Sequence, residues 1–180
     1  MKNRTELAKL FAKLDFHVGA EIGVETGYYS EVLCANNPEL KLSCIDSWRF
    51  YDSFDDYKTR RPFEVKYEEA VKRLSKYNCD IINGFSMDVV KTFKDESLDF
   101  VYIDANHNYE FVRDDIREWT KKVREGGIVS GHDYIDLPGR NLGVIRAVDE
   151  YVKEHGYGLS ITTHNGSRDH RCPSWFFTKI

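Results

Sequence analysis

The strongest constraint on the fold of this chain is a regular alternation between strand-type and helix-type segments. Residues 98–103 form a near-continuous apolar run, which is typical of a strand buried on both faces of a parallel sheet. The charged segment that follows has apolar residues spaced by four, three and four positions, as on one face of a helix. These residues are Val112, Ile116, Trp119 and Val123. The sequence therefore predicts a strand followed by a helix.

The same alternation extends along the whole chain. Strands are predicted at 17–24, 40–45, 80–82, 98–103, 128–130, 159–163 and 175–178. Helical stripes of apolar residues cover 7–14, 30–36, 67–74, 89–93, 112–123 and 144–152, and Gly126-Gly127 is expected to end the fifth of these helices. This order predicts an α/β fold, a Rossmann-like three-layer sandwich with a mostly parallel sheet. The last two strands have only a loop between them, which favours an antiparallel pair.

Length and charge limit the classes of protein to which the chain belongs. The 180 residues suit one domain, 1–180, and the 41% hydrophobic and 31% charged fractions are those of a soluble globular protein. No apolar run is long enough to span a membrane, and because no apolar segment follows the basic start of the sequence, we do not expect export. The net charge is −4, so nucleic acid is not an expected partner. The four cysteines lack C-x-x-C spacing, and we expect a cytoplasmic protein with reduced thiols; homo-oligomerisation is left open.

Polar and glycine-rich groups follow each of the first five predicted strands. In open α/β sheets, ligands bind outside the carboxyl ends of the strands, so these groups are expected to meet at one edge. The five groups are Glu21 to Gly27, Asp46 to Trp48, Asn83 to Ser86, Asp104 to His107 and Gly131 to Tyr134. The sequence therefore predicts a ligand site at this edge.

The glycine turn after the first strand argues against a dinucleotide. Gly19, Gly23 and Gly27 lack the G-x-G-x-x-G spacing, and a pyrophosphate would be repelled by Glu21 and Glu25. Acidic side chains can instead accept hydrogen bonds from an ammonium group. Asp46, near the end of the second strand, is placed to bind ribose hydroxyls, and Trp48 could supply an aromatic wall for a base. An NAD-dependent oxidoreductase is therefore disfavoured, whereas a cofactor-binding module without catalysis stays a rival interpretation.

Four segments together resemble the class I S-adenosylmethionine-dependent methyltransferases, and within them the small macrocin-type sugar O-methyltransferases. The segments are GAEIGVETG at 19–27, DSW at 46–48, DFVYIDANHNY at 99–109 and GGIVSGHDY at 126–134. The likeness covers the chain from about Lys13 to its end, and the D-x-x-H-x-Y and G-G-x-x-x-G-H-D-Y pair is its most specific part. The resemblance implies a seven-stranded sheet with a reversed last strand.

The resemblance also implies roles for site residues. Glu21, Gly23 and Gly27 would hold the methionine part of S-adenosylmethionine, and we expect Glu25 and Tyr28 beside them. Asp46 would bind the ribose, and we expect Ser47 and Trp48 to belong to the cofactor site beside it. The adenine would lie beside Gly84, Phe85 and Ser86.

Catalytic and metal-binding roles follow for the ends of the fourth and fifth strands. Asp104 and Asp133 match positions that hold a divalent metal in relatives, and His107 matches a general base. His132 stands where such relatives have an acidic residue, so it is a candidate ligand or a neutral hydrogen-bonding group. Mg²⁺ prefers oxygen ligands, and a histidine can take a hydroxyl proton at neutral pH. The structural alternatives are a helix cap for Asp104 and an Asx turn for Asp133.

These features predict O-methylation of a hydroxyl on a small molecule or a glycan. An amine acceptor is the alternative, but the Asn/Asp-Pro-Pro-Tyr signature of many such enzymes is absent after the fourth strand. Two further segments are candidates for ligand contact. Residues 50–63 carry aromatic and basic side chains that could cover the site, and Arg168, His170 and Arg171 could bind an anionic group.

Overall fold

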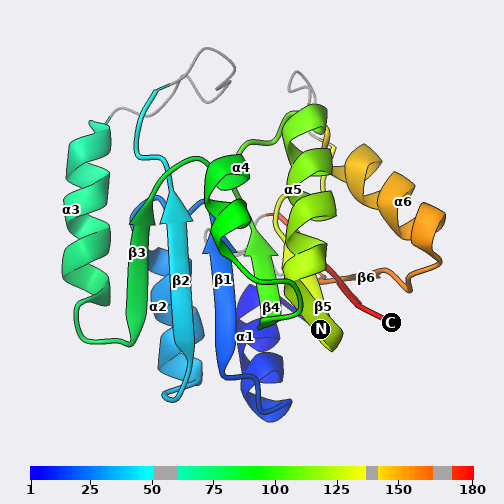
Figure 1. Cartoon of the computed structure of the whole chain (residues 1–180), viewed down its shortest axis with the longest axis horizontal. Helices are drawn as coiled ribbons and strands as arrows, with labels where there is room; N and C mark the ends of the chain where they lie inside the picture. The colour runs from blue at the N-terminus through cyan, green and yellow to red at the C-terminus, as the bar shows by residue number, and fades with distance from the viewer. Residues whose placement is uncertain (51–60, 137–141, 164–171) are drawn as a thin grey trace.

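The computed structural model describes residues 1–50, 61–136, 142–163 and 172–180. A seven-stranded sheet with the order β3-β2-β1-β4-β5-β7-β6 forms its centre (Figure 1). The strands are β1 (Val18–Ile22), β2 (Lys41–Asp46), β3 (Cys79–Asn83), β4 (Leu98–Ile103), β5 (Val123–Gly131), β6 (Ser160–Ile161) and β7 (Trp175–Thr178). Strands β1 to β5 are parallel, whereas β7 runs antiparallel to both β5 and β6. The predicted fold, with its reversed last strand, is confirmed.

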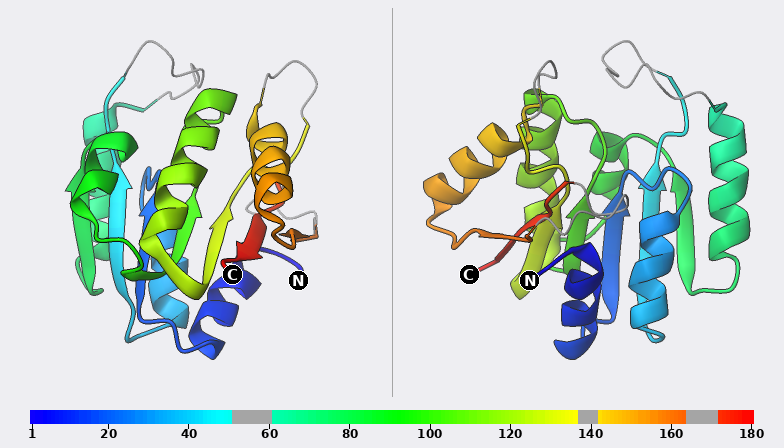
Figure 2. Two further views of the ribbon diagram at one scale, coloured as in Figure 1. Left: turned by 45° about the vertical axis from the view of Figure 1, so that its right-hand side comes forward. Right: turned by 180° about the vertical axis from the view of Figure 1, so that it is seen from behind.

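Helices cover both faces of the sheet. One face carries α1 (Arg4–Lys13), α2 (Tyr28–Asn36) and α3 (Phe63–Leu74). The other carries α4 (Ser86–Val89), the 3-10 helix η1 (Val90–Thr92), α5 (Tyr109–Lys122) and α6 (Val144–His155). Figure 1 shows α4 and α5 in front of the sheet, and the right view of Figure 2 shows α1 and α2 behind it.

Strand β4 shows why the sheet needs helices on both faces. Its side chains alternate between two buried clusters, because successive residues of a strand point to opposite faces. Phe100 and Tyr102 pack toward α1 and α2, and Val101 and Ile103 pack toward α5 and α6. These four side chains are at most 4% exposed, as predicted for a strand buried on both sides.

The end of α5 differs from the expectation. The helix ends at Lys122, and Val123 already pairs with Leu98 as the first residue of β5. Gly126 and Gly127 therefore lie within β5, where the pairing with β4 shifts register. Gly126 has a φ of +73° and Gly127 has no room for a Cβ, which would lie 2.5 Å from Asp99 O. The glycines allow an irregular strand; they do not end the helix.

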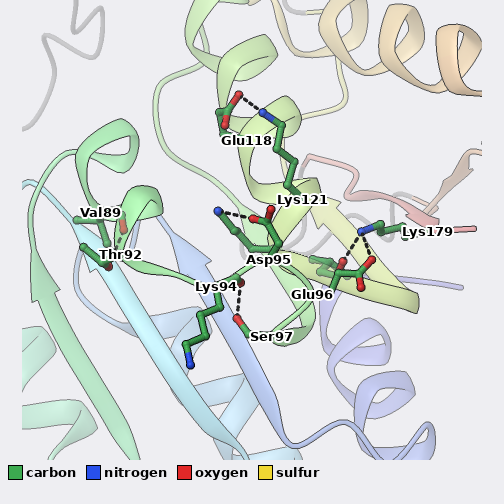
Figure 3. Close-up of polar contacts among 11 residues, drawn as sticks. Val89, Thr92, Lys94, Asp95, Glu96, Ser97, Glu118, Lys121 and Lys179 are labelled. Atoms are coloured by element: carbon green, nitrogen blue, oxygen red, sulfur yellow. Dashed lines mark hydrogen bonds and ion pairs between the residues drawn. The ribbon is translucent and has the colours of Figure 1, made fainter.

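Side chains near the amino end of β4 hold the chain between η1 and β4. Lys122 of α5 binds Asp95 at 2.6 Å, and Lys179 lies 3.4 Å from Glu96 (Figure 3). Ser97 Oγ donates to the carbonyl of Lys94 at 2.7 Å. The carboxylates of these ion pairs are exposed, so the pairs contribute little to stability, and they lie at the opposite end of the strands from the predicted site.

Two of the predicted ligand-binding segments lie largely or wholly outside the described residues. Residues 51–60 make up most of the candidate cover, and the basic loop at 164–171 contains Arg168, His170 and Arg171. Among the helices that the structure describes, none is long and apolar enough to cross a membrane.

Candidate active site

A cavity of about 560 Å³ lies at the carboxyl ends of the parallel strands, at the upper edge of the sheet in Figure 1. Of the residues predicted to bind the cofactor or a metal ion or to act as the base, all except Gly27 line it. Those residues are Glu21, Gly23, Glu25, Tyr28, Asp46, Ser47, Trp48, Gly84, Phe85, Ser86, Asp104, His107, His132 and Asp133. The edge on which the sequence placed the ligand is therefore concave and lined by these groups.

Gly23 and Gly27 shape the turn between β1 and α2 in different ways. Gly23 has a φ of +92°, and a Cβ there would lie 2.1 Å from the carbonyl oxygen of Asp104. Only glycine allows the turn to approach the end of β4 so closely. Gly27, with a φ of +74°, precedes α2 and faces Leu74 of α3, where a Cβ would lie at 3.2 Å. Its place in the structure is the start of the helix, away from the cavity lining.

Asp46 organises the first turn. Its Oδ2 accepts a hydrogen bond from the backbone N–H of Glu25 at 2.8 Å, and its Oδ1 accepts one from Trp48 N at 2.9 Å. The indole of Trp48 donates to the carbonyl of Glu25 at 2.7 Å, and this side chain is buried. Burial raises the pKa of Asp46 despite these hydrogen bonds. A carboxylate oxygen can accept more than one hydrogen bond, so Asp46 can bind both the turn and a ligand.

Glu25 already has a cationic partner. Its Oε1 lies 2.7 Å from Nζ of Lys66, a buried α3 residue that sequence reasoning did not identify. Glu25 itself adopts a left-handed φ of +52°. Trp48 and Asp133 share such a conformation, with φ of +41° and +54°. Left-handed non-glycine residues are uncommon and cluster at functional sites, and three of them stand at the strand ends around this cavity.

Glu21 is the most deeply buried acid of the site. It is 1% exposed and accepts a hydrogen bond from Ser30 Oγ. Burial raises the pKa of Glu21 to about 8, although Ser30 and the cation Arg4 act in the opposite direction. Arg4 also lines the cavity, with its Nη1 3.6 Å from Asp104 Oδ2. It was missed from the sequence because no motif links the first helix to the glycine turn.

Asp104, His107 and Asp133 form a compact group at the ends of β4 and β5. Nε2 of His107 lies 2.8 Å from Asp133 Oδ2 and 3.7 Å from Asp104 Oδ1, and one ligand atom from each residue lies within 4.8 Å of the others. Burial acts to lower the pKa of His107, but the two carboxylates outweigh it and raise this pKa to about 10. Burial acts to raise the pKa of Asp133, whereas the two imidazoles hold it far below its usual range.

His132 stands beside this group. Its Nδ1 lies 3.1 Å from Asp133 Oδ1 and 3.8 Å from Asp104 Oδ2. Its Nε2 is buried and has no hydrogen-bond partner among the residues that the structure describes. Asp104, Asp133 and His107, which was predicted as a base, thus form a group that could hold a metal ion. His132, a predicted candidate ligand, is not one of these three residues.

The far end of the cavity contains a buried polar network. The hydroxyl of Ser86 donates to Asp115 and accepts a hydrogen bond from Trp119 Nε1 at 2.8 Å. Asp115 is 4% exposed, and burial raises its pKa to about 7. Sequence reasoning missed this acid, although its spacing from Val112 and Trp119 places it on the apolar face of α5, where a carboxylate needs a partner.

The comparisons with known proteins agree with this architecture. Residues 20–134 match the model of the family described as a methyltransferase domain. None of the curated proteins compared with the chain matches it in sequence. The matched segment runs from β1 to the end of β5 and therefore contains the predicted site residues on the strand ends.

Solved structures share the fold at low identity. The O-methyltransferase TomG from Streptomyces achromogenes, in complex with SAM, is 16% identical, with a TM-score of 0.70 over 98% of this chain and 80% of that chain. An O-methyltransferase from Bacillus cereus in complex with SAH is 13% identical, with a TM-score of 0.70 over 98% of this chain and 80% of that chain. An rRNA methylase from Streptococcus thermophilus is 13% identical, with a TM-score of 0.70 over 100% of this chain and 98% of that chain.

The family match confirms the enzyme class that the sequence predicts, whereas the narrower macrocin-type assignment stays a prediction. The structural neighbours confirm the Rossmann-like arrangement of the sheet and its helices. The chain belongs to the methyltransferase-domain family and is an S-adenosylmethionine-dependent methyltransferase of the class I fold.

Proposed function

We propose that this enzyme transfers the methyl group of S-adenosylmethionine to a hydroxyl group of a small molecule or a glycan, as a macrocin-type O-methyltransferase. The observation that carries the proposal is the group of His107, Asp104 and Asp133 at the wall of the cavity, next to the glycine turn. A hydroxyl must lose a proton as it attacks a methyl group. His107 can take that proton, and the two carboxylates can stabilise the positive charge that the imidazole then carries.

The cofactor assignment follows the order of groups along the cavity. The methionine part lies against the β1 turn, near Gly23 and Glu21, where buried acids favour a positively charged ligand. The ribose lies at Asp46 and the adenine beside Gly84 to Ser86. The sulfonium then faces the end of β4, where Asp104 and His107 stand.

His107 is the proposed general base. Its imidazole lines the cavity, and its Nε2 faces the carboxylates of Asp133 and Asp104. Asp133, 2.8 Å from this nitrogen, stabilises the imidazolium that forms when His107 accepts the acceptor's proton. Without another cation nearby, the same carboxylates favour the protonated form of His107. A positive charge bound beside them offsets this effect, and His107 is then neutral and able to accept a proton.

The residues present fit a divalent cation. Two carboxylates and one imidazole nitrogen within 4.8 Å of one another are a reasonable set for Mg²⁺ or Mn²⁺. We assign Asp104 and Asp133 as the ligands. When bound, such an ion lowers the pKa of a nearby substrate hydroxyl and helps to orient it. His132, 3.1 Å from Asp133, orients that carboxylate from the other side.

The acceptor is proposed to be a small molecule or a glycan because of the charge of the chain. A net charge of −4 and an acidic cavity edge do not attract a polyanion, although one structural neighbour is described as an rRNA methylase. A hydroxyl is favoured over an amine because the base and the carboxylates would be needed to remove its proton.

Calorimetric titration with S-adenosylhomocysteine and, separately, with NAD tests the cofactor. We expect binding of S-adenosylhomocysteine only; binding of NAD alone would overturn the proposal. Methyl transfer is then measured on panels of hydroxyl and amine acceptors. Cofactor binding with transfer to neither panel would support a non-catalytic binding module.

Titration with Mn²⁺ and Mg²⁺, compared with a chelated sample, tests the cation. We expect increased methyl transfer with the ion and weaker ion binding in Asp133→Asn. A His107→Gln variant that keeps its affinity for the ion supports the base assignment, whereas loss of that affinity makes His107 a ligand.

A further inference from the structure

We infer that Arg4 of α1 binds the α-carboxylate of the methionine part of the cofactor. This inference rests on the proposed placement of S-adenosylmethionine in the cavity. It concerns a residue outside the matched family segment, which begins at residue 20.

The fold brings Arg4 to the cavity from a distant part of the sequence. It is the first residue of α1, and the right view of Figure 2 shows that helix running along the back of the sheet, with its start nearest the carboxyl ends of the strands. Tyr29 of α2 donates a hydrogen bond from its hydroxyl to the carbonyl oxygen of Arg4 at 2.9 Å. This bond fixes the start of α1 against α2, next to the glycine turn.

The guanidinium of Arg4 lies, largely covered, between aromatic rings and the carboxylate of Asp104. The side chain is 15% exposed, and its Cζ lies 4.9 Å from the ring centroid of Tyr29 and 5.9 Å from that of Tyr28. Arginine stacks on aromatic faces in this way, which restricts its rotamers. The planar group is thus held in one place at the cavity wall before any ligand binds.

This partly buried cation interacts with the hydroxyl of Tyr102 but has further donors to spare. Its Nε is buried without a hydrogen-bond partner among the residues described. Its Nη1 is 3.6 Å from Asp104 Oδ2, a distance too long for a hydrogen bond. A guanidinium has five N–H donors in a planar fork, and an unsatisfied buried donor is costly. An anionic ligand group in the cavity would satisfy donors that the protein leaves open.

The charges around the methionine part explain why a cation is needed there. Asp104, and Glu21 once the cofactor's ammonium favours its ionised form, suit the positively charged groups of the cofactor but would repel its carboxylate. Among the described residues, the other long cationic side chains of the cavity lining are placed differently. Lys66 is bound to Glu25 at 2.7 Å, and Arg49 is exposed and lies over the ring of Phe85. Arg4 is therefore the cation suited to bind the carboxylate in a bidentate manner.

The test compares two ligands that differ only in this carboxylate. S-adenosylhomocysteine and its decarboxylated form, S-adenosyl-3-thiopropylamine, are titrated calorimetrically into the full chain, into Arg4→Gln and into Arg4→Lys. We expect Arg4→Gln to weaken S-adenosylhomocysteine binding roughly 10- to 100-fold, the usual effect of losing a charge-assisted hydrogen-bond pair. Binding of the decarboxylated ligand should change less than threefold. Arg4→Lys, which keeps the charge but loses the fork, should give an intermediate loss.

Lys9→Gln is the matched control, because it removes an exposed positive charge from the same helix. It should leave both affinities unchanged, and thermal unfolding of each variant checks that it folds. Equal weakening of both ligands by Arg4→Gln would overturn the inference and make Arg4 a structural partner of Asp104. Unchanged affinity for S-adenosylhomocysteine with a raised KM for the acceptor would overturn it too. If the unaltered chain does not bind S-adenosylhomocysteine, the proposed function itself fails.

Discussion

At the scale of single residues, His107 carries the most direct prediction about chemistry. Replacing it with Gln removes the proton acceptor but keeps a polar side chain of similar size. We expect the kcat of methyl transfer to fall by roughly 10²- to 10⁴-fold, the usual contribution of a general base, while the Kd for S-adenosylhomocysteine stays unchanged. Stopped-assay kinetics and calorimetry measure these two quantities.

His17→Gln is the control for this change, because His17 is half-exposed and lies at the amino end of β1, far from the cavity. It should behave like the unaltered enzyme. Full activity of His107→Gln would remove the base assignment. A loss of cofactor affinity as large as the loss of kcat would instead show that His107 shapes the cofactor site.

Residue identities at the strand ends could be predicted, but their contacts could not. Asp104, His107 and Asp133 follow buried strands directly, so the sheet topology alone brings them to one edge. Their mutual distances depend on side-chain directions that no sequence spacing determines. The position of Arg4 in the site could not be predicted for a related reason. The apolar pattern of a helix predicts which face packs against the sheet, but not which groups its polar side chains contact.

At the scale of elements, the junction between β1 and β4 leaves no room for a side chain at Gly23. Gly23→Ala places a methyl group 2.1 Å from the carbonyl oxygen of Asp104 and forces alanine into a φ of +92°. Such backbone strain costs on the order of 1–3 kcal/mol, and the steric clash adds to it. We expect Tm to fall by several degrees or more and binding of S-adenosylhomocysteine to be lost, as measured by thermal unfolding with and without the ligand.

Gly158→Ala is the matched control, because a Cβ there meets no atom within 4 Å. It should leave both Tm and ligand binding close to those of the unaltered chain. If Gly23→Ala behaves the same way, then the close approach of the turn to β4 is not a requirement of the site.

The hydrophobic patterns predicted the elements well where one period held over many residues. The stripe on α5 and the apolar run of β4 are examples. The predicted end of α5 was wrong because glycines are also tolerated in an irregular strand. Strand β5 begins directly after Lys122, without a connecting loop. Local composition cannot distinguish these cases, since the pairing partner of Val123 is a distant residue, Leu98.

At the scale of the whole molecule, the strand order places the site between the two halves of the sheet. Strands β1 and β4 are neighbours in the sheet although two strands separate them in the sequence, so the chain changes direction at this point. The alternation of elements predicted an open parallel sheet, and the family resemblance implied seven strands with the last one reversed, but the order of the strands was not predicted. Helix–strand periodicity carries no information about which strands pair.

Global stability should depend on pH through the buried acid Glu21. Its pKa is raised to about 8 in the folded state, against an ordinary value of 4.5. Below pH 4.5 the residue is protonated in both states and has no effect; between 4.5 and 8 only the unfolded state loses the proton, so stability falls as pH rises. Each unit of pKa difference corresponds to about 1.4 kcal/mol, so the loss amounts to several kcal/mol in total.

Glu21→Gln isolates this contribution, because Gln can still accept the hydrogen bond from Ser30 but cannot ionise. Other acids, such as Asp115 with its pKa of about 7, titrate equally in both proteins and cancel in the comparison. We therefore expect the difference in unfolding free energy between Glu21→Gln and the unaltered chain to grow in favour of the variant from pH 5 to pH 8, as measured by urea denaturation without cofactor. A difference that does not change with pH would mean that Glu21 ionises in the folded protein as readily as in the unfolded chain. The ammonium group of S-adenosylhomocysteine favours the ionised carboxylate of Glu21. Adding this ligand should therefore reduce the pH dependence of the unfolding free energy of the unaltered chain.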